Sequence, residues 1–117
     1  MALIELSENI IDNFLINSSF TGLRSIYAIK LSFDNKIAFN KNNFTKEIFF
    51  GAEDYFYGFI IACYAVGLID FNMKDDVVTI TGLNNHLSAR IVGIVEELSL
   101  TNELRKQSVD NTKKYFE

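Results

Sequence analysis

His86, Cys63 and Ser88 have side chains of types that can take part in catalysis, and the first two can also bind metals. His86 is the only histidine and Cys63 the only cysteine, and the two lie far apart in the chain. Zinc sites and Cys-His catalytic pairs need further ligands or a nearby base, so neither can be assembled from these residues. Ser88 lacks the glycine-flanked turn of a hydrolase nucleophile, and the sequence has no glycine-rich phosphate loop. The sequence therefore predicts a non-enzymatic protein with no catalytic residues, no bound metal, no cofactor and no small-molecule substrate.

Cys63 lies within the run from Tyr55 to Ile69, which comprises fifteen uncharged and almost wholly apolar residues. Apolar surroundings raise the pKa of a thiol and suppress its reactivity, which indicates a core residue. Because a lone cysteine allows no disulfide framework, we expect an intracellular, cytoplasmic protein. A helix of this length rises only about 22 Å, too little for a bilayer, so the run predicts a buried helix and no membrane contact.

Basic residues gather in one part of the chain, although its net charge is −4. This basic band, between residues 24 and 50, consists of Arg24, Lys30, Lys36, Lys41 and Lys46. Lysine and arginine on one surface can neutralise phosphates, and aromatic residues interleaved with them can stack on bases. The acidic total opposes general binding to polyanions, so nucleic acid is our second choice of partner, through this band.

Two helices are expected before residue 36. Ser7 can cap the first helix, and Asn17-Ser18-Ser19 interrupts it and offers caps for the second. The second helix has one apolar face and ends near Asp34-Asn35. Apolar residues also alternate between Tyr27 and Phe33, so a hairpin that turns at Asp34-Asn35 competes with this helix. We favour the helix.

Shorter elements are expected between residue 36 and the apolar run. Residues 36–40 are a candidate strand, and Asn43 or Thr45 begins a brief helix that continues through Phe50. Gly51 is suited to end that helix in a left-handed conformation. Glu53-Asp54 then falls in the first turn of the apolar helix, where the positive end of the helix dipole favours acids.

Beyond Leu68 the apolar residues recur at every second position, which predicts a hairpin joined at Lys74-Asp75-Asp76 and ending at Gly82. Asn84 or Asn85 can then cap one long final helix within residues 83–115. Four apolar residues repeat along it at four-three-four spacing and form what we name the C-terminal seam: Leu87, Ile91, Ile94 and Leu98. The seam could pack on the core or pair with a second copy. The charged residues that follow are expected to be exposed and partly frayed.

The segments Ala65-Val66-Gly67-Leu68-Ile69-Asp70-Phe71 and Val77-Val78-Thr79-Ile80-Thr81 resemble the third helix and wing of the winged-helix superfamily. The resemblance implies a single domain over residues 1–117, mainly α with one β-hairpin. Its core would span residues 18–82, with an extra N-terminal helix and a long C-terminal helix. Many unrelated functions share this fold. In addition, Asn17-Ser18-Ser19-Phe20-Thr21-Gly22-Leu23-Arg24 is similar to small middle components of bacterial three-component ABC-type conflict systems.

On a helical wheel, on which each residue is rotated by 100° from the one before, the apolar helix carries two stripes of residues. The first stripe comprises Tyr55, Phe59, Ala62 and Val66, and the opposite one, named the tyrosine stripe, comprises Tyr57, Ile61, Tyr64 and Leu68. Winged-helix domains normally present one face of this helix to DNA, but here it offers no Arg, Lys, Asn or Gln to read bases. We expect the tyrosine stripe to be covered either by the domain's own first or last helix or by a partner chain.

Three functions follow as expectations. The first is a protein-interaction module, either a small subunit or adaptor of an assembly or a homodimer, which contacts its partner through the tyrosine stripe or the C-terminal seam. The second is a helix-turn-helix transcription regulator that binds DNA through the basic band. The third is a phage or mobile-element protein that inhibits a host factor. The acidic turn Lys74-Asp75-Asp76 opposes contact with phosphates and favours the first.

Overall fold

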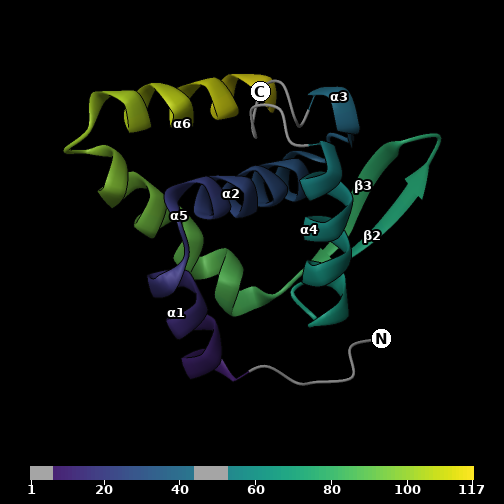
Figure 1. Cartoon of the computed structure of the whole chain (residues 1–117), viewed down its shortest axis with the longest axis horizontal. Helices are drawn as coiled ribbons and strands as arrows, with labels where there is room; N and C mark the ends of the chain where they lie inside the picture. Colours follow the sequence, from purple (N-terminus) through teal and green to yellow (C-terminus); the bar gives the residue numbers. More distant parts are fainter. Residues whose placement is uncertain (1–6, 44–52) are drawn as a thin grey trace.

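The computed structural model describes residues 7–43 and 53–117 as a mainly helical fold with a small antiparallel sheet (Figure 1). In chain order, the elements are α1 (Glu8–Asn17), α2 (Phe20–Asn35), β1 (Phe39–Asn40), α3 (Lys41–Asn43), α4 (Glu53–Ala65), β2 (Ile69–Lys74), β3 (Val77–Leu83), α5 (Asn85–Ser99) and α6 (Glu103–Tyr115). The brief helix expected from Asn43 or Thr45 through Phe50, with its end at Gly51, lies outside the described residues except for Asn43, which ends α3.

Side-chain caps begin the helices where the sequence predicts them. Ser7 Oγ accepts a hydrogen bond from the Ile10 N–H at 3.3 Å, and Ser19 Oγ accepts one from the Gly22 N–H at 3.2 Å. Asn84, rather than Asn85, caps α5. Each cap satisfies a backbone donor that the first helical turn leaves without a partner.

Helix α2 occupies the stretch for which a hairpin was the alternative, so the expected helix is confirmed and the hairpin is wrong. It packs against α5, α6 and β3 and runs through the middle of the fold (Figure 1). Lys36 ends the helix with a left-handed backbone at φ 55°, and the Ile37 N–H then donates to the Ser32 carbonyl at 3.1 Å. A central helix can bury residues on several faces, which is why its apolar pattern also contains a strand-like alternation.

The predicted hairpin is confirmed as β2 and β3, and β1 adds a third strand, so the order in the sheet is β1-β3-β2. Asp75 and Asp76 form the turn with φ of 53° and 64°, the left-handed pair that a two-residue hairpin turn requires. Strand β3 continues to Leu83, one residue past the expected end at Gly82. A Cβ at Gly82 would lie 3.0 Å from Asp70 Oδ2, so glycine lets the two strands approach there.

Three phenylalanines from distant parts of the chain meet at the centre of the core. The ring of Phe39 packs edge-on against Phe56 and Phe116, with centroids 6.1 and 6.2 Å apart and interplanar angles of 82° and 86°. All three side chains are at most 1% exposed. Edge-to-face pairs of this kind add to the free energy gained by burying each ring. The buried cluster extends from Ile11 to Phe116 and therefore goes well beyond the expected core at residues 18–82.

The C-terminal region forms two helices, so the expectation of one long helix is wrong. Helix α5 ends at Ser99, and Asn102 caps α6 by accepting a hydrogen bond from the Arg105 N–H at 3.1 Å. Helix α6 packs back across α5 and α2 (Figure 1). Most of residues 103–114 are exposed, as expected, but they form a helix that buries Val109 and Thr112, so the expectation of a partly frayed tail is wrong.

None of the helices in residues 7–43 and 53–117 is both long enough and apolar enough to cross a membrane.

Candidate interaction site

Helix α4 points a third face, between the two stripes, into the core. Phe56, Ile60 and Cys63 are 0%, 2% and 5% exposed, respectively. At 100° per residue these positions lie midway between the Tyr55 side and the Tyr57 side of the helix. Neither stripe is therefore the core face, and both flank it. The opposite, outward side of α4 carries Gly58, Ile61 and Ala65, which are exposed.

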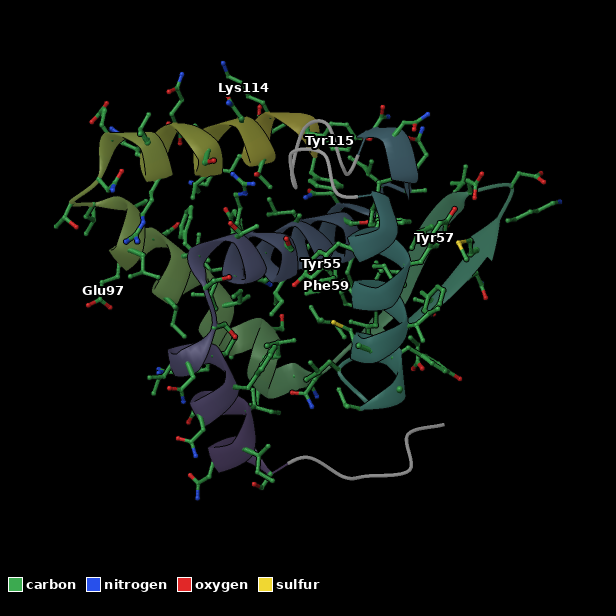
Figure 2. The ribbon with its side chains drawn as sticks, in the orientation of Figure 1. Tyr55, Tyr57, Phe59, Glu97, Lys114 and Tyr115 are labelled. Carbon is green, nitrogen blue, oxygen red and sulfur yellow. The ribbon has the colours of Figure 1, made fainter. Side chains whose placement is uncertain are left out.

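The domain's own hairpin covers much of the tyrosine stripe. The sequence predicted instead that the first or last helix of the domain, or a partner chain, would cover it. The hydroxyl of Tyr57 donates a hydrogen bond to Asp76 Oδ1 at 2.5 Å. Tyr64 packs edge-on against Phe71 of β2, with ring centroids 5.5 Å apart. Figure 2 shows Tyr57 on the hairpin side of α4 and Tyr55 on the other side. The coverage is incomplete, since Ile61 remains 54% exposed and Tyr64 38%.

Leu68, the last member of the tyrosine stripe, is a core residue with an exposure of 4%. Its expected role in an interface is therefore wrong for the folded chain, because a side chain with so little exposed area cannot reach a partner. The helix ends at Ala65, and Gly67 follows with φ 83°. This left-handed residue redirects the chain and turns Leu68 inward, a change of direction that a helical wheel extended through residue 68 does not contain.

The first stripe faces helix α1 across an apolar cleft of about 390 Å³. Tyr55, Phe59, Ala62 and Val66 supply the α4 side, and Ile10 and Phe14 supply most of the α1 side. Tyr55 is 50% exposed and Ile10 is 52% exposed, so the two helices leave apolar surface open between them.

Half of the C-terminal seam is internal to the domain. Leu87 is 1% exposed and Ile91 is 0% exposed, so the expected contact of these two residues with a second copy is wrong. Helix α5 packs on α1 and α2, and its most deeply buried residues continue with Val95 rather than Ile94. Ile94 and Leu98 are half-buried at the edge of the core.

Two of the three basic-band residues whose side chains the structure describes, Arg24 and Lys30, are held in contacts within the domain. Arg24 is 4% exposed, its Nη1 donates to Ser108 Oγ of α6, and burial lowers its pKa. Lys30 is paired with Asp34 Oδ2 at 2.7 Å and donates to Ser88 Oγ at 3.0 Å. Lys36 is exposed, whereas the side chain of Lys41 and all of Lys46 lie outside the described parts of the chain. Arg24 and Lys30 therefore cannot contribute to the expected nucleic-acid contact.

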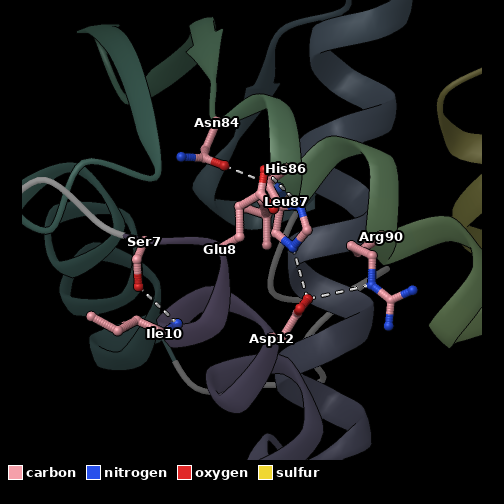
Figure 3. A network of polar contacts seen from close by, with 8 residues as sticks. All are labelled: Ser7, Glu8, Ile10, Asp12, Asn84, His86, Leu87 and Arg90. Carbon is pink, nitrogen blue, oxygen red and sulfur yellow. Dashed lines mark hydrogen bonds and ion pairs between the residues drawn. The ribbon is translucent and has the colours of Figure 1, made fainter.

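A polar cluster joins α1 to α5, and sequence reasoning missed it because its members are far apart in the chain (Figure 3). His86 Nε2 lies 2.8 Å from Asp12 Oδ1, and Arg90 Nε lies 3.4 Å from the same oxygen. Glu8 Oε1 is 3.9 Å from the other ring nitrogen of His86. Since a carboxylate only accepts, Nε2 of His86 carries the hydrogen that bonds Asp12. This hydrogen bond, with the charges of His86 and Arg90, lowers the pKa of Asp12 despite the opposing effect of burial.

We expect Asp12→Asn to lower the free energy of unfolding at neutral pH, because the amide cannot replace the ionic contacts of Asp12. The pKa of Asp12 in the folded chain lies below 3.8, its ordinary value. The carboxylate therefore stabilises the fold above this pH, and its contribution is lost as the pH falls through the lower, folded-state pKa. Urea denaturation across this range should show the variant and the wild type converging in acid. Glu97→Gln, at an exposed position of α5, is the control. A difference that does not depend on pH would contradict this assignment.

Cys63 is buried, and burial raises the pKa of its thiol to about 12, so it is not a nucleophile at neutral pH. Within residues 7–43 and 53–117 no three His, Cys, Asp or Glu side chains come together in a group that could hold a metal ion.

Comparison with protein-family models, with curated proteins and with solved structures gives no match for this chain.

Proposed function

We propose that this chain is a non-enzymatic winged-helix protein-interaction module, either a small subunit or adaptor of a larger assembly or a homodimer. The contact surface is named here the α4 patch and consists of the outward residues Gly58, Ile61 and Ala65 together with the exposed part of Tyr64 beside them. One observation carries the proposal. The patch faces solvent, with Ile61 54% and Tyr64 38% exposed, in a stretch without a single charged residue between Tyr55 and Ile69.

The chemistry of the α4 patch suits a protein partner. Tyrosine is enriched in interfaces because it buries a large ring while its hydroxyl can remain hydrogen-bonded. A Cβ placed on Gly58 would meet nothing within 4 Å, so the backbone of another chain has room to approach the helix there. Ile61 adds aliphatic surface that gains free energy when it is removed from water.

The order of elements from α2 through α5 supports the winged-helix part of the proposal, with α4 as the third helix and β2-β3 as the wing. A DNA reader would need donors and acceptors on α4 and a positive wing. The α4 patch has no polar group except the Tyr64 hydroxyl, and the wing ends in Asp75 and Asp76. No observation on the described residues favours the DNA-binding alternative.

The test is a double charge substitution on the patch, Ile61→Glu with Tyr64→Glu. Leu68 is left unchanged because it is buried, and a glutamate there would unfold the chain. Leu104→Glu adds the same kind of charge at a residue that is 78% exposed and lies outside the patch, so it is the matched control. Each tagged chain is purified from native lysate, and the mass of its complexes is measured by mass photometry.

We expect the wild type and Leu104→Glu to form the same complex, either a homodimer or an assembly with another protein. The patch variant should remain a monomer with unchanged helical circular dichroism, since two buried carboxylates would disfavour the interface by several kcal/mol, roughly a hundredfold or more in affinity. A patch variant that keeps the complex, or a wild type that is monomeric and has no partner, would show that the proposal is wrong.

A further inference from the structure

The cleft between α1 and α4 is lined almost entirely by apolar side chains. Helix α1 packs on α5, and its residues Ile10 and Phe14 line the cleft together with the first stripe of α4. Ile10 is 52% exposed and Phe14 is 40% exposed, although both belong to the wall of a cleft. Apolar surface that lines a concavity on two sides is the usual character of a ligand site.

The volume of the cleft indicates what kind of occupant fits. At about 390 Å³, it lies within the range of roughly 300–1,000 Å³ seen for small-molecule sites. The α1 wall extends only from Ile10 to Phe14, little more than one helical turn, so its length suits a small molecule better than a partner helix. The cleft is much larger than a cavity of roughly 150 Å³, which is sufficient for benzene.

The charge character of the lining further restricts the class of molecule that can bind in the cleft. None of the described residues that line the cleft is charged, and the polar atoms of their side chains are limited to the Tyr55 hydroxyl and the Cys63 thiol. A carboxylate or ammonium group moved from water into such a lining would lose its hydration without gaining a counter-ion. The acids of α1, Glu8 and Asp12, face His86 on α5 instead of the cleft.

Helix α1 is held in place partly by contacts on the side that faces α5. Asp12 holds it to α5 through His86 and Arg90 (Figure 3), and Leu15 is fully buried in the core. The contacts that hold the α1 wall therefore include Asp12 and Leu15, neither of which lines the cleft, and Ile11, which does. Ile10 and Phe14 keep exposed apolar surface that an occupant can bury.

We infer that the α1/α4 cleft is a binding site for one uncharged, mainly apolar small molecule, which goes beyond the protein-interaction function proposed above. The gain in free energy comes from covering Ile10, Phe14 and the exposed side of Tyr55. The uncharged lining selects neutral molecules over anions and cations of similar size.

The test uses N-phenyl-naphthylamine, a neutral aromatic probe whose fluorescence rises in apolar surroundings. Ala62→Phe fills the cleft with a ring, whereas Ala89→Phe adds the same ring at an exposed position of α5 that lines neither the cleft nor the α4 patch. We expect saturable binding of one probe per chain, weakened at least about tenfold by Ala62→Phe and unchanged by Ala89→Phe.

A second pair of variants tests the other wall. Phe14→Asp places a charge in the cleft, and Ile16→Asp places one at a position of α1 that is 71% exposed and outside the cleft. Decanol and decanoate, added as competitors, separate neutral from anionic ligands of the same chain length. We expect Phe14→Asp to abolish probe binding and Ile16→Asp to leave it unchanged. We also expect decanol to displace the probe at concentrations at which decanoate does not.

Several outcomes would overturn the inference. A fluorescence increase that does not saturate is the first, and full probe binding by Ala62→Phe is the second. The others are an equal loss of binding in Ala62→Phe and Ala89→Phe, or equal displacement of the probe by decanol and decanoate. Circular dichroism of each variant shows whether the helices are intact. If Ala62→Phe unfolds, Phe14→Asp and its control Ile16→Asp decide between the two outcomes.

Discussion

Phe116→Ala should lower the free energy of unfolding by about 3–5 kcal/mol, although Phe116 is the residue before the last. The side chain is 1% exposed and packs edge-on against Phe39, which in turn contacts Phe56. Removing the ring leaves a cavity at the point where β1, α4 and the end of α6 meet, and the chain cannot close it without moving one of them. Urea denaturation followed by circular dichroism measures the loss.

The control for this variant is Asn111→Ala, an exposed position of the same helix, which should change the stability by no more than about 0.5 kcal/mol. If α6 were a frayed tail, both substitutions would be equally harmless. A loss below about 1 kcal/mol in Phe116→Ala would therefore contradict the placement of this helix against the core.

Ile91→Ala should lower the free energy of unfolding by about 2–5 kcal/mol, and the loss should not depend on protein concentration. Ile91 is 0% exposed on the face of α5 that packs against α1 and α2. A residue buried within one chain contributes to unimolecular stability. A residue buried only in a dimer contributes through association, so its effect would vary with concentration.

Glu97→Ala, at an exposed position of the same helix, is the matched control and should have little effect on stability. Denaturation of both variants at protein concentrations a hundredfold apart, on the order of micromolar upward, separates the two cases. If the denaturation midpoint of Ile91→Ala approached that of the wild type as the protein concentration rose, Ile91 would instead belong to an interface between two copies of the chain.

The α4 patch and the α1/α4 cleft lie on adjacent sides of the same helix. Ile61 and Tyr64 belong to the patch, and Phe59 and Val66 to the cleft. The two surfaces share no side chain, so Ala62→Phe and Ile61→Glu with Tyr64→Glu can fail or succeed independently. A protein that loses its partner but still binds the probe would show that the two surfaces act separately.

The local features of this chain are determined by its sequence. Ser7, Ser19 and Asn84 cap helices because an oxygen on a short side chain reaches the free N–H groups of the next turn, which depends on neighbours only. The hairpin follows from alternating residues on both sides of a two-residue turn. The uncharged run from Tyr55 to Ile69, which supplies most of α4, is likewise visible without a structure.

Only the tertiary structure decided which side chains remain available to a partner. Periodicity shows that the Tyr57 side of α4 is apolar, but not that the hairpin would fold against Tyr57 and Tyr64. It places Leu68 and Ile91 on apolar faces but does not distinguish a face that meets the core from one that meets a second chain. Arg24 has the charge of a surface residue and becomes buried because α6 returns across α2.

The physical reason is the range of the interactions involved. Caps, turns and helical spacing arise between residues a few positions apart, so their residue types are sufficient to predict them. Burial arises between residues such as Asp12 and His86 or Phe39 and Phe116, whose approach depends on the path of the whole chain. The break at Asn102 shows both effects together. A local cap begins α6, but the burial of Val109 and Phe116 makes that helix part of the fold.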